Sequence, residues 1–332
     1  MRDVVFVTGT PGWLGSALVE ALKKNKRKVR CLVLKGASLL HLQNLGVEIV
    51  EGDIAVPSSI KDDYFTDVCT VFHCAGIIHP KLFRARDFYK INRDGTKNLL
   101  EKSVSAGVEK FIYISSNAAA GVNKVNGNLM REGDTENPYT DYGKSKWQAE
   151  QVVKEFQNKR LIKTVIIRPC WFYGPKLPDR MIKLAKMIKS GKPLLFGDGK
   201  NLRSMTYVYD LVDALILAEK NNNAIGQTYW ITDERPYTTI EIYRTMAKIF
   251  EVDNLEFRKI PASVSIVLEL VDKTLGKFGI YEINFHVGGE MTRDIAVSIE
   301  KAKNELGWKP KHGGLEEGMR ESLKWAMENN LI

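Results

Sequence analysis

The first half of the chain alternates short, continuously apolar runs with longer amphipathic segments. The apolar runs occupy residues 4–8, 29–34, 47–51, 68–74, 111–115 and 161–167, and segments such as 12–24 and 88–106 lie between them. Runs that are apolar throughout are typical of parallel strands buried under helices on both faces. The sequence therefore predicts an α/β fold with a doubly wound parallel sheet of the Rossmann type.

The pattern changes after residue 168. Turn-rich stretches at 174–178 and 191–199 are followed by helical patterns over 179–190, 239–250, 262–275, 295–306 and 315–329, while 208–218 and 227–231 read as a helix and a strand that return to the sheet. We expect one domain from residues 1–168 and about 204–232. We expect a smaller, mostly helical domain from about 169–203 and 233–332.

Composition excludes several classes of protein. Apolar residues make up 44% and charged residues 27%, an ordinary balance for a globular protein. The net charge of +9 comes from residues spread along the chain, so we expect no nucleic-acid partner. The most apolar helical stretch, 264–271, is far shorter than the roughly 20 residues of a membrane span, so we expect no membrane partner.

Cysteine and histidine usage adds two expectations. The four cysteines form no Cys-x-x-Cys pair, and the five histidines show no metal-ligand spacing, so we predict free thiols and no bound metal. The first apolar run begins almost at Met1, which predicts that no targeting segment precedes it. Together these features predict a cytoplasmic protein.

The first apolar run leads into a glycine-rich turn, Thr8-Gly9-x-x-Gly12-Trp13-Leu14-Gly15. Such a turn permits a tight strand-to-helix connection, and it lets the backbone approach a pyrophosphate at a helix N-terminus. A glycine pattern alone is weak evidence, but this one opens a βαβ run, which is the required context. The sequence therefore predicts a dinucleotide site, with an ordinary turn as the alternative.

The second apolar run bears on the choice of dinucleotide. No acidic residue occurs between Glu20 and Glu48, whereas Arg30 lies within the run and Lys35 follows it. An acid there binds the ribose hydroxyls of NAD, and a basic residue suits the 2′-phosphate of NADP. We therefore expect NADP, with Lys35 as its phosphate partner unless it is a plain surface lysine, and NAD as the alternative. Asp53 could bind the adenine amino group or cap the next helix.

A second motif supplies proton chemistry. Tyr142 and Lys146 are spaced i, i+4, so they share one face of a helix. A nearby ammonium lowers the pKa of a tyrosine, which lets the phenol exchange a proton with a hydroxyl or carbonyl. Ser116 ends an apolar run and can hydrogen-bond the reacting oxygen. Tyr-x-x-x-Lys often occurs by chance, but its order after Ser-Ser and the glycine turn favours a hydride-transferring enzyme.

The chain resembles the extended short-chain dehydrogenase/reductases, the superfamily of sugar-nucleotide epimerases and dehydratases, 3β-hydroxysteroid dehydrogenases and dihydroflavonol reductases. The resemblance covers nearly the whole sequence. It is carried by the glycine turn, by Tyr142 and Lys146, and by the segments 52–54, 73–76, 92–100, 113–116, 168–175, 207–210 and 301–308.

The resemblance implies roles for particular residues. Ser116, Tyr142 and Lys146 would form the catalytic triad. The cofactor would lie against a set that adds Asp53, Ile54, Ala75, Gly76, Asn92, Ser115 and Pro169 to the glycine turn. It also implies a homodimer, formed through the helical segments 92–106 and 142–157.

Two departures from the family pattern bear on the substrate. Trp171 stands where nucleotide-sugar members usually have asparagine, and Ala120 stands where they often have tyrosine. These changes favour an apolar substrate, with Trp171 and Asn117 in its pocket. Against them, Arg203 stands where epimerases hold a nucleotide phosphate, although it could be a structural arginine.

We therefore expect an oxidoreductase that interconverts a secondary alcohol and a ketone on a small, partly apolar substrate. A nucleotide-sugar epimerase or dehydratase with tightly bound NAD is the alternative. A cofactor-sensing protein without catalysis is a minor one, since such proteins tend to lose the tyrosine or the lysine.

Overall fold

The computed structural model describes residues 2–80 and 84–332, and its centre is a seven-stranded parallel sheet. The strand order is β11-β6-β5-β4-β1-β2-β3, which confirms the doubly wound sheet. The strands are β1 (Val4–Thr8), β2 (Lys28–Val33), β3 (Glu48–Glu51), β4 (Val68–His73), β5 (Lys110–Ile114), β6 (Lys163–Pro169) and β11 (Thr228–Ile231). The order reverses between β1 and β4, whose carboxyl ends lie side by side, and ligands bind at such a switch point.

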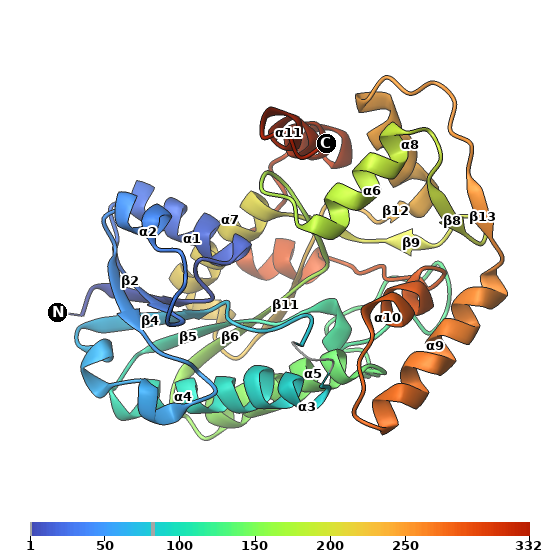
Figure 1. Cartoon of the computed structure of the whole chain (residues 1–332). Coiled ribbons are helices and arrows are strands. Elements are labelled where there is room, and N and C mark those ends of the chain that lie inside the picture. Colours follow the sequence, from blue (N-terminus) through green and yellow to red (C-terminus); the bar gives the residue numbers. More distant parts are fainter. Residues whose placement is uncertain (1, 81–83) are drawn as a thin grey trace.

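Helices cover both faces of this sheet (Figure 1). On one face α1 (Trp13–Lys24), α2 (Leu40–Asn44) and α7 (Val208–Lys220) share a core with β1, β2 and β6. On the other face α4 (Gly95–Ser105) and α5 (Asp141–Asn158) bury their apolar sides. A short helix α3 (Arg86–Phe88) and a π-helix η4 (Tyr89–Asp94) precede α4. Short turns of helix η1, η2, η5 and η6 lie at Pro57–Ser59, Asp62–Phe65, Asn117–Ala119 and Asn222–Ala224.

The remaining elements pack beyond the carboxyl ends of the strands (Figure 1). The helices α6 (Asp179–Lys189), α8 (Thr239–Ile249) and α11 (Leu315–Glu328) share a separate apolar core. Three small two-stranded sheets join them: β7 (Trp171–Tyr173) with β10 (Met205–Tyr207), β9 (Leu202–Arg203) with β12 (Tyr237–Thr238), and β8 (Leu194–Phe196) with β13 (Arg258–Ile260).

A pair of helices, α9 (Ala262–Lys277) and α10 (Ile283–Glu290), lies at the outer edge of the molecule (Figure 1). The two helices approach closely at Gly288, where an added Cβ would lie 2.4 Å from Leu268 Cδ1. Ser265 on α9 donates a hydrogen bond to the Gly288 carbonyl at 2.6 Å. Within the described residues, no helix is both long and apolar enough to cross a membrane.

One predicted helix is wrong in its first half. Residues 295–299 are extended, and helical structure covers only 300–306, ending in the π-helix η7 (Ala302–Leu306). Ile295 bridges to Arg203, and Val297 bridges to Met130. The apolar spacing imitates a helix, but backbone hydrogen bonds to two distant segments satisfy these residues instead.

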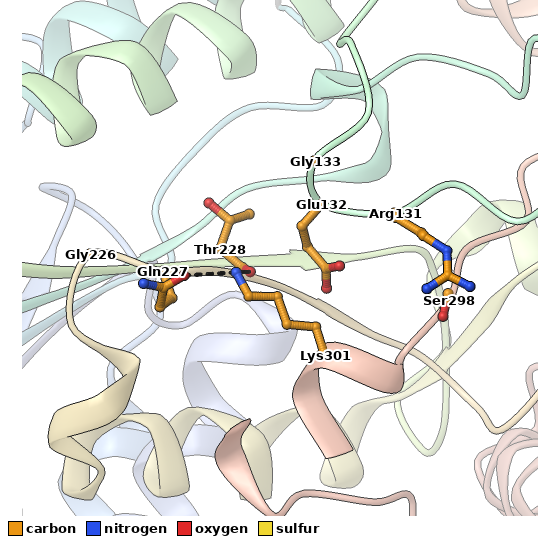
Figure 2. A pocket seen from close by; sticks show the side chains of 8 residues that line it. All are labelled: Arg131, Glu132, Gly133, Gly226, Gln227, Thr228, Ser298 and Lys301. Carbon is orange, nitrogen blue, oxygen red and sulfur yellow. Dashed lines mark hydrogen bonds between the residues drawn. The ribbon is translucent and has the colours of Figure 1, made fainter. Parts of the chain in front are cut away.

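The edge strand β11 contacts charged side chains. The Glu132 carboxylate accepts a 3.0 Å hydrogen bond from the Trp230 amide, and Lys301 Nζ donates to Gln227 Oε1 at 2.8 Å. Burial raises the pKa of Glu132. A hollow here has a volume of about 430 Å³. Figure 2 shows the side chains that line it, which are Arg131, Glu132, Gly133, Gly226, Gln227, Thr228, Ser298 and Lys301. It adjoins the amino end of β11 and does not include the residues predicted for catalysis.

Candidate active site

The glycine turn is packed so tightly that side chains have no room at three positions. Gly9 has a φ of +83°, and a Cβ there would lie 2.5 Å from the carbonyl carbon of Cys74 on the neighbouring strand end. A Cβ on Gly12 or Gly15 would lie 2.6 or 2.5 Å from the Gly9 carbonyl oxygen. The turn therefore brings bare backbone to the switch point of the sheet.

The N-terminus of α1 follows this turn and is open to an anion. Gly12 caps the helix without any side-chain hydrogen bond, and the first turn carries no acidic residue. Trp13 Nε1 donates to the Pro175 carbonyl at 2.6 Å, which fixes the turn against the loop after β7, while Leu14 is buried. Free amide groups and the helix dipole favour negative charge here. These residues fit the pyrophosphate of a dinucleotide.

A buried hydrogen-bonded chain lies beneath the site. Thr8 Oγ1 contacts His73 Nδ1 at 2.7 Å and accepts from the Ala75 amide at 3.2 Å. The other ring nitrogen of His73 contacts Thr96 Oγ1 at 2.9 Å, and Thr96 donates to the Asn92 carbonyl. Burial lowers the pKa of His73 to about 3, so the ring is neutral at physiological pH. No role was predicted for His73 or Thr96, although both lie in segments that carry the resemblance.

Asn92 holds the loop after β4. Its Oδ1 accepts from the Ile77 amide at 2.8 Å, and its Nδ2 donates to the Ile77 carbonyl at 3.1 Å and to Ser145 Oγ at 3.0 Å. A Cβ on Gly76 would lie 3.0 Å from Asn92 Oδ1. The strip from Ala75 to Ile77 is thereby fixed beside the glycine turn, where the resemblance predicts the cofactor.

Tyr142 and Lys146 lie on one face of α5, which begins after the capping residue Thr140. Lys146 is buried, and its Nζ donates to the Ile114 carbonyl at 2.7 Å and lies 4.4 Å from the centre of the Tyr113 ring. Burial lowers the pKa of Lys146 to about 7, against an opposing effect of Glu150. Lys146 thus lies at the carboxyl end of β5.

The electrostatics of Tyr142 differ from the sequence prediction. Burial raises the pKa of Tyr142, and this effect outweighs the lowering by a hydrogen bond to the Ser116 side chain and by the charge of Arg180. The ammonium of Lys146 is bound to the Ile114 carbonyl, so it does not supply the predicted lowering. The phenol is therefore protonated at neutral pH and is suited to donate a proton.

Ser116 completes this group at the end of β5. Its backbone is extended, and its Oγ accepts from the Ala118 amide at 3.3 Å as the cap of η5. The neighbouring Ser115 hydroxyl is buried and has no hydrogen-bond partner among the described residues. Asn117 is also buried. Ser116 and Tyr142 are thus brought together, and Ser115 leaves an unsatisfied hydroxyl next to them.

Aromatic residues that sequence reasoning missed lie next to Tyr142. The Phe88 ring centre is 5.8 Å from that of Tyr142, and Tyr281 meets Phe88 edge-on at 5.1 Å. His79 Nδ1 contacts the Tyr281 hydroxyl at 2.8 Å. These side chains come from three distant segments, so no local spacing could have predicted them. Together they give the neighbourhood of Tyr142 a largely aromatic side.

Trp171 and Arg203 stack on each other. The Arg203 guanidinium lies 4.8 Å from the Trp171 ring centre and is 1% exposed. It donates to the Glu290 carbonyl, while its Nε and Nη1 have no hydrogen-bond partner in the described part of the chain. Burial lowers the pKa of Arg203. Arg203 is therefore neither a surface arginine nor a fully satisfied structural one.

A second buried arginine, Arg168 on β6, contacts α5. Arg168 Nε and Nη2 donate to the two carboxylate oxygens of Glu150 at 2.8 and 2.5 Å, and Nη2 also reaches Glu136 at 2.8 Å. Glu150 is four residues after Lys146, on the same face of α5. The i, i+4 spacing could have shown that Glu150 shares a face with Lys146, but not that Arg168 binds it. The pair fixes α5 to β6, which ends at Pro169.

Lys35 and Arg30, the two basic residues predicted to favour NADP over NAD, have different surroundings in the structure. Lys35 is exposed just beyond β2. Arg30 donates to the Tyr64 carbonyl at 2.6 Å and pairs with Glu48, which directs it away from the carboxyl end of β2. Arg30 is therefore not available to a phosphate there.

Asp53 uses a carboxylate oxygen to accept from the Ala55 amide at 2.8 Å. It therefore closes a turn after β3. It does not cap the next helix, η1, whose N-cap is Val56 without a side-chain hydrogen bond. Its neighbour Ile54 is buried, and a Cβ added to Gly95 on α4 would lie 2.8 Å from it.

Comparison with known proteins identifies the family of this chain. Residues 5–231 match the model of the NAD dependent epimerase/dehydratase family, which covers more than half of the chain. The protein belongs to this family of NAD-dependent enzymes. Among the described residues, no cluster of three or more His, Cys, Asp or Glu side chains could hold a metal ion.

Individual relatives span several activities. The chain is 34% identical to the uncharacterized protein y4nL of Sinorhizobium fredii, over 98% of this chain and 96% of that protein. It is 27% identical to the UDP-glucose 4-epimerase of Vibrio cholerae, covering 99% and 97% of the two chains. It is 27% identical to a 3-beta-hydroxysteroid dehydrogenase of Mycolicibacterium neoaurum, covering 92% and 87%.

Solved structures support the same fold. The UDP-glucose 4-epimerase of Thermotoga maritima, determined with UDP-glucose, superposes with a TM-score of 0.80 at 24% identity, covering 98% of this chain and 99% of that one. The likeness establishes the fold.

Proposed function

We propose that this protein is an NAD(P)-dependent oxidoreductase that interconverts a secondary alcohol and a ketone on a small, partly apolar substrate. The proposal rests on the grouping of Ser116 and Tyr142 at the carboxyl end of β5, with Lys146 one turn further along α5. A glycine turn and an uncapped helix lie at the neighbouring strand end.

The residues present fit a dinucleotide. The turn from Gly9 to Gly15 and the N-terminus of α1 would hold its pyrophosphate, and Gly76 would lie along it. Bound there, the reduced nicotinamide would supply the hydride that the substrate carbon takes up in reduction, and the oxidised nicotinamide would accept it in the reverse direction. Lys146, with a pKa near 7, would find a hydrogen-bond acceptor in the nicotinamide ribose.

The chain's own residues move the proton. Tyr142 is protonated at neutral pH and donates its proton to the substrate oxygen during reduction. The Ser116 hydroxyl hydrogen-bonds the same oxygen and holds it beside the phenol. In the oxidative direction Tyr142 accepts the proton instead. Lys146 stabilises the phenolate that reduction leaves, once its ammonium turns from the Ile114 carbonyl.

We further propose NADP as the preferred cofactor, with Lys35 binding the 2′-phosphate. The support is the exposure of Lys35 beyond β2 and the absence of any acid between Glu20 and Glu48 in the sequence. Substituting Lys35→Glu should lower the ratio of kcat/KM for NADP over NAD by about tenfold, since one charge-assisted contact is lost. An unchanged ratio would leave Lys35 a surface lysine.

Support for an apolar substrate comes from the side chains around the phenol. Phe88 and Tyr281 lie next to Tyr142, and Trp171 presents an indole where a diphosphate would need an amide. Aromatic rings offer flat apolar contact area. The 3-beta-hydroxysteroid dehydrogenase among the relatives acts on a substrate of this kind.

One observation favours a second candidate function, a nucleotide-sugar epimerase. Two buried nitrogens of Arg203 have no hydrogen-bond partner among the described residues, and a phosphate oxygen would satisfy them if Trp171 moved aside. An epimerase is also among the relatives. In that reaction the same tyrosine would act twice, with no net change in the cofactor.

One experiment tests both candidates. The purified protein is analysed for its nucleotide, and absorbance at the nicotinamide band is followed with a panel of ketones, alcohols and UDP-sugars. Net substrate-dependent turnover supports the dehydrogenase, whereas retained NAD and sugar interconversion without net turnover support the epimerase.

Substituting Tyr142→Phe should lower kcat at least about 100-fold. Tyr64→Phe, which loses only a hydroxyl bound to the Glu51 carbonyl, is the matched control and should keep its rate. Full activity of Tyr142→Phe would exclude the proposed mechanism in either form.

A further inference from the structure

The outer face of α9 exposes an unusual amount of apolar surface. Ile266, Val267 and Leu270 are 61%, 57% and 65% exposed, and Phe278 just after the helix is 77% exposed. Positions 266, 267 and 270 fall within one turn of a helix, so these side chains form one stripe. Large side chains are seldom left uncovered together in this way unless they meet a partner.

The few buried side chains of α9 lie on its opposite face, which contacts α10. Ser265 donates to backbone carbonyls of α10, and Leu268 packs on Gly288. The helix's two acids, Glu269 and Asp272, also lie on this side, each 12% exposed, and Asp272 contacts His286. α9 is therefore held to the protein by one narrow face, and its outer face carries no acid in the fully described stretch 262–278.

Basic residues flank the apolar stripe. Arg258 and Lys259 are exposed on β13, just before α9, and Lys277 is exposed at its end. None of these three forms an ion pair with the described residues, whereas Lys273 pairs with the inward Glu269. An apolar stripe between unpaired cations is complementary to an anionic membrane, which has an apolar interior and a negatively charged surface.

We propose that α9 is an interfacial helix that docks the protein on an anionic membrane surface, with Ile266, Val267, Leu270 and Phe278 entering the acyl boundary. No membrane partner was predicted from the sequence, because residues 264–271 are too short to span a bilayer. An interfacial helix lies in the plane of the membrane and needs no such length. The flanking cations would contact lipid phosphates.

The loop at the end of α9 also connects this surface to the active site. The Gly279 carbonyl accepts from the Ala85 amide at 3.0 Å, and Tyr281, two residues later, is buried against Phe88 beside Tyr142. Docking would therefore place the aromatic side of the site close to the bilayer. This last step rests on the proposed function, whereas the docking itself does not.

Vesicle flotation tests the proposal. The full chain is mixed with vesicles of phosphatidylcholine containing roughly one-third phosphatidylglycerol, and with vesicles of phosphatidylcholine alone. We expect binding to the anionic vesicles, little binding to the neutral ones, and weaker binding at high salt. The catalytically impaired Tyr142→Phe protein should bind equally well, so failure of docking and failure of the proposed reaction are distinguishable.

A triple variant, Ile266→Ser, Leu270→Ser and Phe278→Ser, should bind anionic vesicles at least about tenfold more weakly. The matched control replaces three exposed apolar residues elsewhere, Leu40→Ser, Val125→Ser and Leu161→Ser, and should bind like the natural protein. Because all six side chains are exposed, both variants should keep the natural melting temperature. A charge variant, Arg258→Gln, Lys259→Gln and Lys277→Gln, should lose the preference for anionic vesicles.

Two results would overturn the proposal. One is the absence of flotation by the natural protein, or equal flotation of the α9 variant and its control. The other is a change of oligomeric state, in which light scattering finds an oligomer that the α9 variant dissociates without any vesicle binding. The stripe would then be an interface between copies of this chain.

Discussion

Two fully buried arginines lie on either side of the active site, and their surroundings differ sharply. Arg168, in β6 below the catalytic helix, meets both oxygens of Glu150, one oxygen of Glu136 and the Trp230 ring. Arg203, in β9 beyond the strand ends, has the Trp171 ring and one carbonyl oxygen. Each is 1% exposed.

The difference indicates that the charge of Arg168 is structural, whereas the charge of Arg203 is available to bind an anion. A buried cation is expensive unless carboxylates and hydrogen bonds compensate it. Arg168 is compensated, so its pKa is raised, whereas burial lowers the pKa of Arg203. We conclude that Arg168 fixes the floor of the site and that Arg203 is the buried arginine still able to accept an anion.

The largest effect should come from Arg168→Met. The substitution leaves Glu150 buried without its main partner, so we expect a loss of about 3–5 kcal/mol in the free energy of unfolding, measured by urea denaturation. The double variant with Glu150→Gln should recover part of the loss. Arg235→Met, at an exposed pair with Glu241, is the control and should change stability by less than about 1 kcal/mol. A single variant as stable as the control would refute the structural role.

Lys146 is a third buried cation to compare with Arg168 and Arg203, and it differs from them because a lysine can lose its proton and an arginine cannot. Its folded pKa of about 7 lies below the ordinary 10.5, so between these values the unfolded chain binds more protons than the folded one. The stability of the cofactor-free protein should therefore rise as pH increases from about 7 to 10.5, and the penalty should be complete below pH 7. Lys146→Met should lack this contribution when unfolding is measured across that range. Parallel pH profiles for the two proteins would contradict it.

The smallest effect should come from Arg203→Met. Methionine keeps the contact with Trp171 and removes a poorly compensated charge, so the free energy of unfolding should change by less than about 1 kcal/mol or increase. Calorimetry with UDP should then discriminate the two candidate functions. If UDP binds the natural protein and not the variant, the epimerase is favoured. A loss of stability comparable to that of Arg168→Met would erase the distinction between the two arginines.

Much of the sheet could be predicted, because buried parallel strands leave a local signature. The runs at 4–8, 68–74 and 111–115 are mostly apolar, and they match β1, β4 and β5 to within one residue at each end. The glycine turn could be placed because it opens a βαβ run. Tyr142 and Lys146 could be placed on one face because α5 is a regular helix.

The rest depends on contacts between distant segments, which no local spacing encodes. Ile295 and Val297 follow a helical period, yet they pair with Arg203 and Met130 in extended form. The sequence suggests that Arg30 is available to a phosphate, but in the structure it is bound to the Tyr64 carbonyl and to the Glu48 carboxylate. The raised pKa of Tyr142 likewise comes from burial by segments far along the chain.

Glu132 affects whether the edge strand β11 can pair with a strand of another molecule. An outer strand with free amides is a template on which another extended chain can add. The Glu132 carboxylate occupies the Trp230 amide on β11. A strand arriving from another molecule would have to expel a negative charge from a partly buried position before it could pair. Glu132, together with Lys301 on the Thr228 carbonyl, thus protects this edge of the sheet against pairing with a strand of another molecule.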